Sequence, residues 1–231
     1  MPSLDWWLHS PRGLAARIAL GMAVFVVLAL TDLICHGRRA TRYREYLLLL
    51  AAVVAGMAYG AINDQITCRI SWEYFYYGKE LAPRLGLVTP PDNGMLEWEA
   101  AKVGMKATWS AGLIFGVLLL LANNPSRGKP QLPDRALLAW LPRILLSAAI
   151  CGAILGEVGY LGGLARFSAD FPLMLREDLW RPRRFMCVYG IHLGGYVGGM
   201  LGAAWAVISI RRRRVSTAES AEGAETEKAE S

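Results

Sequence analysis

The chain has 231 residues, of which 54% are apolar, and its formal net charge is +6. The apolar residues gather in long runs between charged, proline-rich and glycine-rich stretches, which excludes a single soluble domain with evenly mixed residues. The basic residues flank these runs, where Lys and Arg set membrane orientation, so the positive charge does not predict a nucleic-acid partner.

Five apolar runs have the length of membrane-spanning helices, because about 20 residues cross a hydrocarbon core of about 30 Å. They lie at about 18–35, 46–63, 105–122, 144–161 and 186–210. The sequence therefore predicts an all-α fold, a polytopic bundle of about five spans in one transmembrane domain, 1–210. No large apolar residue follows Val215, so residues 211–231 are predicted to be a disordered cytoplasmic tail.

The first run is expected to be a retained helix and not a cleaved signal peptide, because no small-residue cleavage site follows it. It ends in LTDLIC, and Asp32 stands where a lipoprotein signal needs an apolar residue. Four arginines lie in 36–45, and Arg211–Arg214 follow the last run. Four spans separate these groups, so both face the same side, and the positive-inside rule makes it the cytoplasm. We expect a multi-pass protein of a bacterial inner (plasma) membrane, with its N-terminus outside and its C-terminus cytoplasmic.

The second run ends in a polar and aromatic stretch, YGAINDQITCRISWEYFYYGK, from Tyr59 to Lys79. Trp and Tyr favour the membrane interface, and a short amphipathic segment lying there accounts for the aromatic residues. Such a segment does not explain why the ionisable residues Asp64, Arg69 and Glu73 occur together in this stretch. Arg69 and Glu73 are four positions apart and would pair if this segment is helical.

Glycines at four-residue spacing predict close contacts between the last four helices. Packing within one bundle and homo-oligomer formation through 186–210 are both open interpretations. The glycines are Gly56 and Gly60, Gly112 and Gly116, Gly152 and Gly156, and Gly190, Gly194, Gly198 and Gly202.

In the predicted orientation, four spans carry polar residues at the same depth in the outer half of the membrane. An ionisable side chain costs about 2.5–3.5 kcal/mol at a central membrane position, so such groups usually face the interior and pair. Glu157 could pair with Lys106 or with His192. A purely structural role remains open for each residue. The candidate binding residues of this outer polar cavity are Asp64, Arg69, Glu73, Lys106, Glu157 and His192.

The cysteines predict neither a metal site nor a cofactor, because no two of them are close in sequence and no C-x-x-C motif occurs. A disulfide between Cys68 and Cys187 is possible, since both could face the outside. The other two are Cys35 and Cys151.

Three stretches resemble an uncharacterised family of bacterial polytopic integral membrane proteins with a DQITxRxxxEYF-type motif. They are DQITCRISWEYF followed by YYGK, KATWSAGLIFG from Lys106, and HLGGYVGGMLG from His192. In the first stretch Gly78 fits the family pattern, whereas Lys79 replaces its histidine. The family carries no assigned activity, so the resemblance implies a membrane location and no mechanism.

Three classes of function stay open. The leading one is a binding or accessory role for the outer polar cavity, with lipid headgroups or another membrane protein as the partner. The arginines of 176–184 would favour anionic headgroups. The second class is a membrane-embedded enzyme acting on a lipid or isoprenoid, with Asp64, Glu157 or His192 as acid, base or ligand, although no H-E-x-x-H, G-x-S-x-G or Asp-rich motif occurs. The third is a small oligomeric transporter.

Overall fold

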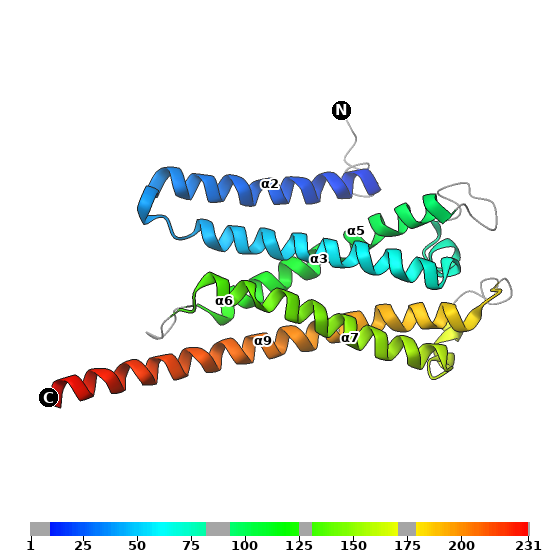
Figure 1. The fold of residues 1–231 in the computed structure, drawn as a ribbon. Helices are drawn as coiled ribbons and strands as arrows, with labels where there is room; N and C mark the ends of the chain where they lie inside the picture. Colours follow the sequence, from blue (N-terminus) through cyan, green and yellow to red (C-terminus); the bar gives the residue numbers. More distant parts are fainter. Residues whose placement is uncertain (1–9, 82–92, 125–130, 171–178, 231) are drawn as a thin grey trace. The chain divides into compact units, whose positions relative to one another are not determined.

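The computed structural model describes residues 10–81, 93–124, 131–170 and 179–230, and every regular element within these ranges is helical (Figure 1). This confirms the predicted all-α fold class. The elements are α2 (Pro11–His36), η1 (Gly37–Arg39), α3 (Tyr43–Ile70), η2 (Tyr74–Gly78), α5 (Asn93–Ala122), α6 (Asp134–Leu138), α7 (Trp140–Tyr160), η4 (Ala165–Asp170) and α9 (Pro182–Glu230).

Five helical stretches are long and apolar enough to cross a membrane, which confirms the predicted number. All five are longer than the apolar runs indicate. α3 continues through Asn63 and Asp64 to Ile70, since no proline or glycine interrupts it there. α5 begins at Asn93, 12 positions before the predicted run at 105–122. The stretches are Arg12–Arg39, Tyr43–Ile70, Gly94–Ala122, Asp134–Tyr160 and Pro182–Thr217.

The chain forms two compact units, each built from segments that are far apart in sequence. Unit 1 contains Met1–Val54, Ser110–Ile144 and Gly202–Ser231. Unit 2 contains Ala55–Trp109 and Leu145–Leu201. The single transmembrane domain 1–210 and the disordered tail stay predictions.

Unit 1 has an apolar core formed by α3, α5, α6, α7 and α9. Its aromatic centre is Trp140, whose ring meets that of Trp205 edge-on with centroids 5.3 Å apart. The buried core residues are Leu48, Ala52, Leu119, Ala122, Leu137, Trp140, Leu141, Ile144, Ala203, Ala206 and Ile210.

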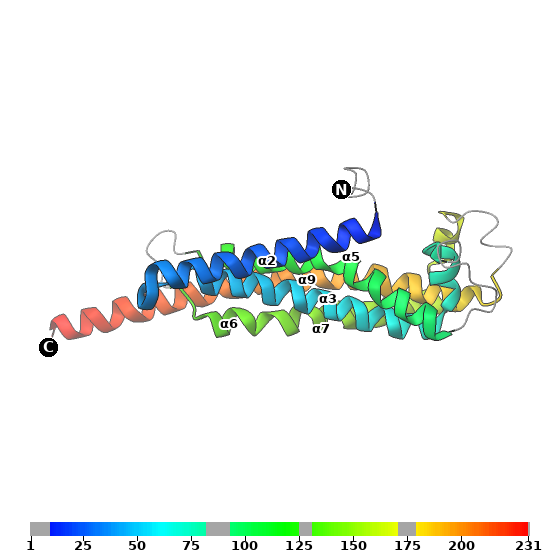
Figure 2. The same ribbon diagram turned by 90° about the horizontal axis from the view of Figure 1, so that it is seen from above.

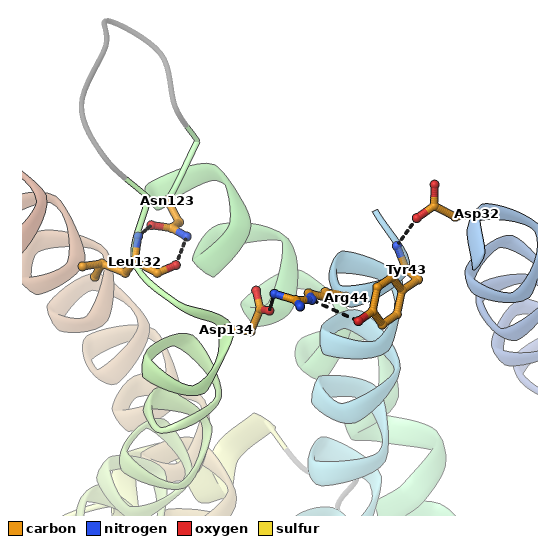
Figure 3. Close-up of polar contacts among 6 residues, drawn as sticks. All are labelled: Asp32, Tyr43, Arg44, Asn123, Leu132 and Asp134. Carbon is orange, nitrogen blue, oxygen red and sulfur yellow. Dashed lines mark hydrogen bonds and ion pairs between the residues drawn. The ribbon is translucent and has the colours of Figure 1, made fainter. Parts of the chain in front are cut away.

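The end of α2 lies beside the start of α3 in both views (Figures 1 and 2). Asp32 makes this connection, because its Oδ2 accepts a hydrogen bond of 2.9 Å from the backbone N–H of Tyr43 at the start of α3 (Figure 3). Its other oxygen lies 2.9 Å from His36 Nδ1. The buried Asp32 carboxylate thus stabilises a helix N-terminus, where negative charge is favoured.

Other polar groups of unit 1 are also partnered. The Asn123 side chain both donates to and accepts from the backbone of Leu132, at 3.0 and 2.9 Å, and so joins the end of α5 to the segment before α6 (Figure 3). Arg214 lies within the segment predicted to be a tail, yet it is buried. Its Nη1 donates to the Ala122 carbonyl at 3.0 Å, which satisfies an acceptor at the α5 C-terminus.

The predicted close helix contacts are present within unit 2. A Cβ at Gly60 would overlap the backbone of Gly104, so α3 and α5 approach closely there. Gly190 and Gly194 of α9 meet the backbone of α7 in the same way. These glycine faces are therefore used within the chain, and a homo-oligomer stays a prediction. All four cysteines are free thiols, so no Cys68–Cys187 disulfide forms.

Candidate functional site

Asp64 of α3 and His192 of α9 lie side by side in unit 2, although 128 positions separate them. The distance from His192 Nε2 to Asp64 Oδ1 is 3.8 Å. Asp64 is only 3% exposed, and the imidazole is largely buried. Ionisable groups within an apolar helical unit are costly and usually functional or tightly paired, so this pair marks a candidate site.

Aromatic rings of η2 pack against the imidazole of His192. The Tyr74 ring is stacked on it, with centroids 5.0 Å apart and an interplanar angle of 12°. Phe75 meets it edge-on at 6.0 Å. Lys79 Nζ lies 5.5 Å from the Tyr74 ring centroid. We refer to Asp64, Tyr74, Lys79 and His192 as the His192 cluster.

Glu73 holds η2 in position for these contacts. Its carboxylate is 1% exposed and accepts hydrogen bonds from the backbone N–H groups of Trp180 at 2.6 Å and Arg181 at 3.2 Å. These N–H groups immediately precede α9, so the carboxylate caps the helix that carries His192. Glu73 is therefore a positioning residue, which keeps Tyr74 stacked on His192.

The hydrogen bonding of the Asp64–His192 pair is incomplete within the described residues. His192 Nε2 is buried and has no hydrogen-bond partner there. The Asp64 side chain accepts one hydrogen bond, from Asn63 Nδ2 at 3.3 Å. Because the large majority of buried polar side-chain atoms are paired, these two incompletely paired groups are candidates for contact with a ligand.

The local chain conformation sets this arrangement. α3 ends at Ile70, and the chain then turns into η2, a single π-helical turn of the kind often found at functional sites. Burial raises the pKa of the Tyr74 phenol, so its hydroxyl stays neutral at physiological pH and the stacked ring carries no charge.

The predicted pairing of Arg69 with Glu73 is wrong. α3 ends between the two residues, so the helical spacing of four positions does not apply to them. Arg69 is exposed and forms two hydrogen bonds with the Glu97 carboxylate of α5, from Nε at 3.1 Å and from Nη2 at 3.0 Å. Arg69 thus lies outside the His192 cluster.

The pairing suggested for Glu157 is also wrong. Glu157 is exposed, and no ion pair joins it to Lys106 or His192. The reason is helical geometry, because Gly152, Gly156 and Gly159 turn one face of α7 toward α9. Glu157 follows Gly156 by one residue and is rotated about 100° away from that face. Lys106 of α5 is half-buried and has no ion-pair partner among the described residues.

The structure therefore brings together Asp64 and His192 from the six predicted residues, with Glu73 in support. Sequence reasoning missed two members of the cluster. Tyr74 was interpreted only as an interfacial aromatic residue, and Lys79 only as a departure from a family pattern. Their closeness in sequence to Asp64 was a usable signal, since a turn after α3 returns the chain toward the helix end.

Unit 1 contains a groove of about 480 Å³ between the ends of α3, α5 and α6, near the contacts of Figure 3. An ion pair of 3.5 Å between Arg44 and Asp134 lies across part of this groove. The groove combines both signs of charge with amide side chains, and its buried polar groups are already paired. The lining residues include Thr41, Arg44, Glu45, Asn123, Asn124, Gln131 and Asp134.

No family model, curated protein or solved structure matches this chain. Among the described residues, no group of three or more His, Cys, Asp or Glu side chains is placed to hold a metal ion. The case for a function therefore depends on the geometry of the His192 cluster.

Proposed function

We propose that this chain is a multi-pass protein of a bacterial inner membrane that binds a lipid headgroup at the His192 cluster. The supporting observation is the incomplete hydrogen bonding of Asp64 and His192, which lie 3.8 Å apart and largely buried in unit 2. A lipid headgroup brings polar atoms to such a pair while its acyl chains stay among apolar helix faces. Large apolar side chains are exposed along the long helices, which suits contact with acyl chains.

The proposed orientation keeps the N-terminus outside and the C-terminus in the cytoplasm. It is supported by the exposed arginines of unit 1, Arg38, Arg39 and Arg42 after α2 and Arg211–Arg213 on α9. The His192 cluster then belongs to the outer leaflet. Reporter fusions test this: a C-terminal green fluorescent protein should fluoresce, and a C-terminal alkaline phosphatase should be inactive. The reverse result contradicts the orientation.

Lipid analysis of the gently purified protein tests the binding function. Native mass spectrometry of the full chain should detect one retained phospholipid, which Asp64→Asn and His192→Phe should each lose. His192→Phe preserves a ring for Tyr74 to stack on, so it removes Nε2 with little change in shape. Asp134→Asn, an exposed carboxylate change in unit 1, is the matched control and should retain the lipid. Equal lipid content in all four proteins would overturn the proposal.

A membrane-embedded enzyme is the second candidate, because Asp64 and His192 also form a possible acid–base pair. In that case the retained lipid would be converted in the wild type and would accumulate unchanged in His192→Phe. Simple binding predicts no such accumulation, so the same lipid analysis separates the two candidates.

A further inference from the structure

The charge of the Asp64 carboxylate is poorly compensated. The side chain is buried, and it forms no ion pair with a lysine or arginine among the described residues. Its neighbours are the neutral amide of Asn63 at 3.3 Å and the imidazole of His192 at 3.8 Å. A buried carboxylate is favourable only when a partner offsets its lost hydration, so the site favours a ligand group with positive charge.

The distance between Asp64 Oδ1 and His192 Nε2 restricts the form of that group. At 3.8 Å the two atoms are too far apart for a direct hydrogen bond, but one donor atom can reach both. A primary ammonium carries three N–H donors and one positive charge. It can donate to the carboxylate and to the lone pair of a neutral imidazole at once. A quaternary ammonium has the charge but no N–H donor.

Lys79 adds a second element of recognition. Its Nζ lies 5.5 Å from the centroid of the Tyr74 ring, which is stacked on the His192 imidazole. Lysine is a common partner of phosphate oxygens. A ligand that joins an ammonium to a phosphate by a short linker therefore complements the cluster at both ends. Its positive charge suits Asp64, and its negative charge suits Lys79.

We propose that the His192 cluster selects an ethanolamine phosphodiester, with the ammonium at Asp64 and His192 and the phosphate toward Lys79. This inference rests on the proposed function, lipid-headgroup binding at the same cluster, and it names the headgroup. The ligand chemistry could come from phosphatidylethanolamine in the bilayer or from soluble glycerophosphoethanolamine, and the experiment separates these sources.

The test is a titration of the delipidated full chain in detergent, followed by tryptophan fluorescence, with Trp72 close to η2 as a reporter. The probes are short-chain phosphatidylethanolamine, phosphatidylcholine and phosphatidylglycerol. Phosphatidylethanolamine should bind about tenfold more tightly than either of the others, the effect of one charge-assisted hydrogen bond. Phosphatidylcholine has the positive charge but no N–H donor, so it tests the contribution of the N–H donors. Phosphatidylglycerol has no positively charged group, so it tests the contribution of the charge.

Variants connect that preference to the cluster. Asp64→Asn and His192→Phe should each weaken phosphatidylethanolamine binding about tenfold and leave phosphatidylglycerol binding unchanged. Lys79→Gln should weaken all three lipids alike, because each carries a phosphate. Asp134→Asn should change nothing. Competition by glycerophosphoethanolamine would identify the headgroup as sufficient, and its failure to compete would identify the bilayer lipid as the source.

Two results overturn the inference in different ways. Equal binding of the three lipids, lost in Asp64→Asn, would reject ethanolamine selectivity and leave lipid binding at the cluster in place. Equal binding in the wild type and in Asp64→Asn, or no binding at all, would reject both the inference and the proposed function.

Discussion

The two units contain buried carboxylates with very different surroundings. In unit 1, Asp32 accepts the N–H of Tyr43 at 2.9 Å and faces His36 at the same distance. In unit 2, and within the described ranges, Asp64 accepts only the Asn63 amide at 3.3 Å and faces His192 Nε2, which has no hydrogen-bond partner in those ranges. A carboxylate with a full set of partners stabilises the fold, whereas one with an incomplete set costs stability. This contrast is the reason that we propose Asp64, and not Asp32, as a binding residue.

The largest predicted effect is a loss of stability at the close contact between α7 and α9, the helix that carries His192. Gly190→Ala should destabilise the protein by about 2–3 kcal/mol, because the new Cβ would overlap the Leu155 carbonyl of α7. Thermal unfolding in detergent measures this change. Gly21→Ala in α2 is the matched control: no atom lies within 4 Å of its new Cβ, and the substitution should stabilise the helix by about 0.5–1 kcal/mol. Equal effects at both positions would show that α7 and α9 do not pack as described.

Glu73 allows the same comparison within unit 2. Its buried carboxylate is well hydrogen-bonded, whereas that of Asp64 is not. Glu73→Ala should lower stability by about 2 kcal/mol, since the N–H groups of Trp180 and Arg181 lose their acceptor. It should also weaken lipid retention, because Tyr74 is no longer held against His192. Glu73→Gln keeps one acceptor oxygen and should restore most of both properties. Lipid loss in Glu73→Ala without any loss of stability would place Glu73 in the binding site itself.

The smallest effect is expected at the exposed pair of Arg69 and Glu97. Their hydrogen bonds are well formed, but water screens the charges and the side chains lose freedom on pairing. Arg69→Gln should leave thermal unfolding and lipid retention unchanged within error. A clear loss of retained lipid in this variant would show that Arg69 contributes to the lipid site, contrary to its position outside the His192 cluster.

The sequence was sufficient to predict the five long helices, because an apolar run of membrane-spanning length has few alternatives to a helix. It also pointed to the stretch that follows the second run, and its six candidate binding residues included Asp64 and His192. Both are ionisable residues inside apolar helices, and such residues usually face the protein interior.

The site itself could not be assembled from the sequence, because its geometry depends on where α3 ends. The pairing of Arg69 with Glu73 assumed a helix through both residues, whereas the chain leaves α3 at Ile70 and Glu73 caps α9 instead. Glu157 shows a different error, since the glycine spacing of α7 already indicated which face meets a neighbour. The turn of η2 stacks Tyr74 on His192 and places Lys79 beside the Tyr74 ring, and this turn has no clear sequence signature.

The most direct test measures stability and retained phospholipid together in Asp64→Ala and Asp32→Ala. We expect opposite outcomes for the two variants. Asp32→Ala should lose about 1 kcal/mol of stability, as expected for a lost helix cap, and keep its lipid. Asp64→Ala should keep its stability within about 1 kcal/mol and lose its lipid, because its charge is poorly compensated in the fold. An Asp64→Ala protein that unfolds more easily than Asp32→Ala and still carries the wild-type amount of lipid would contradict a lipid-binding role for Asp64.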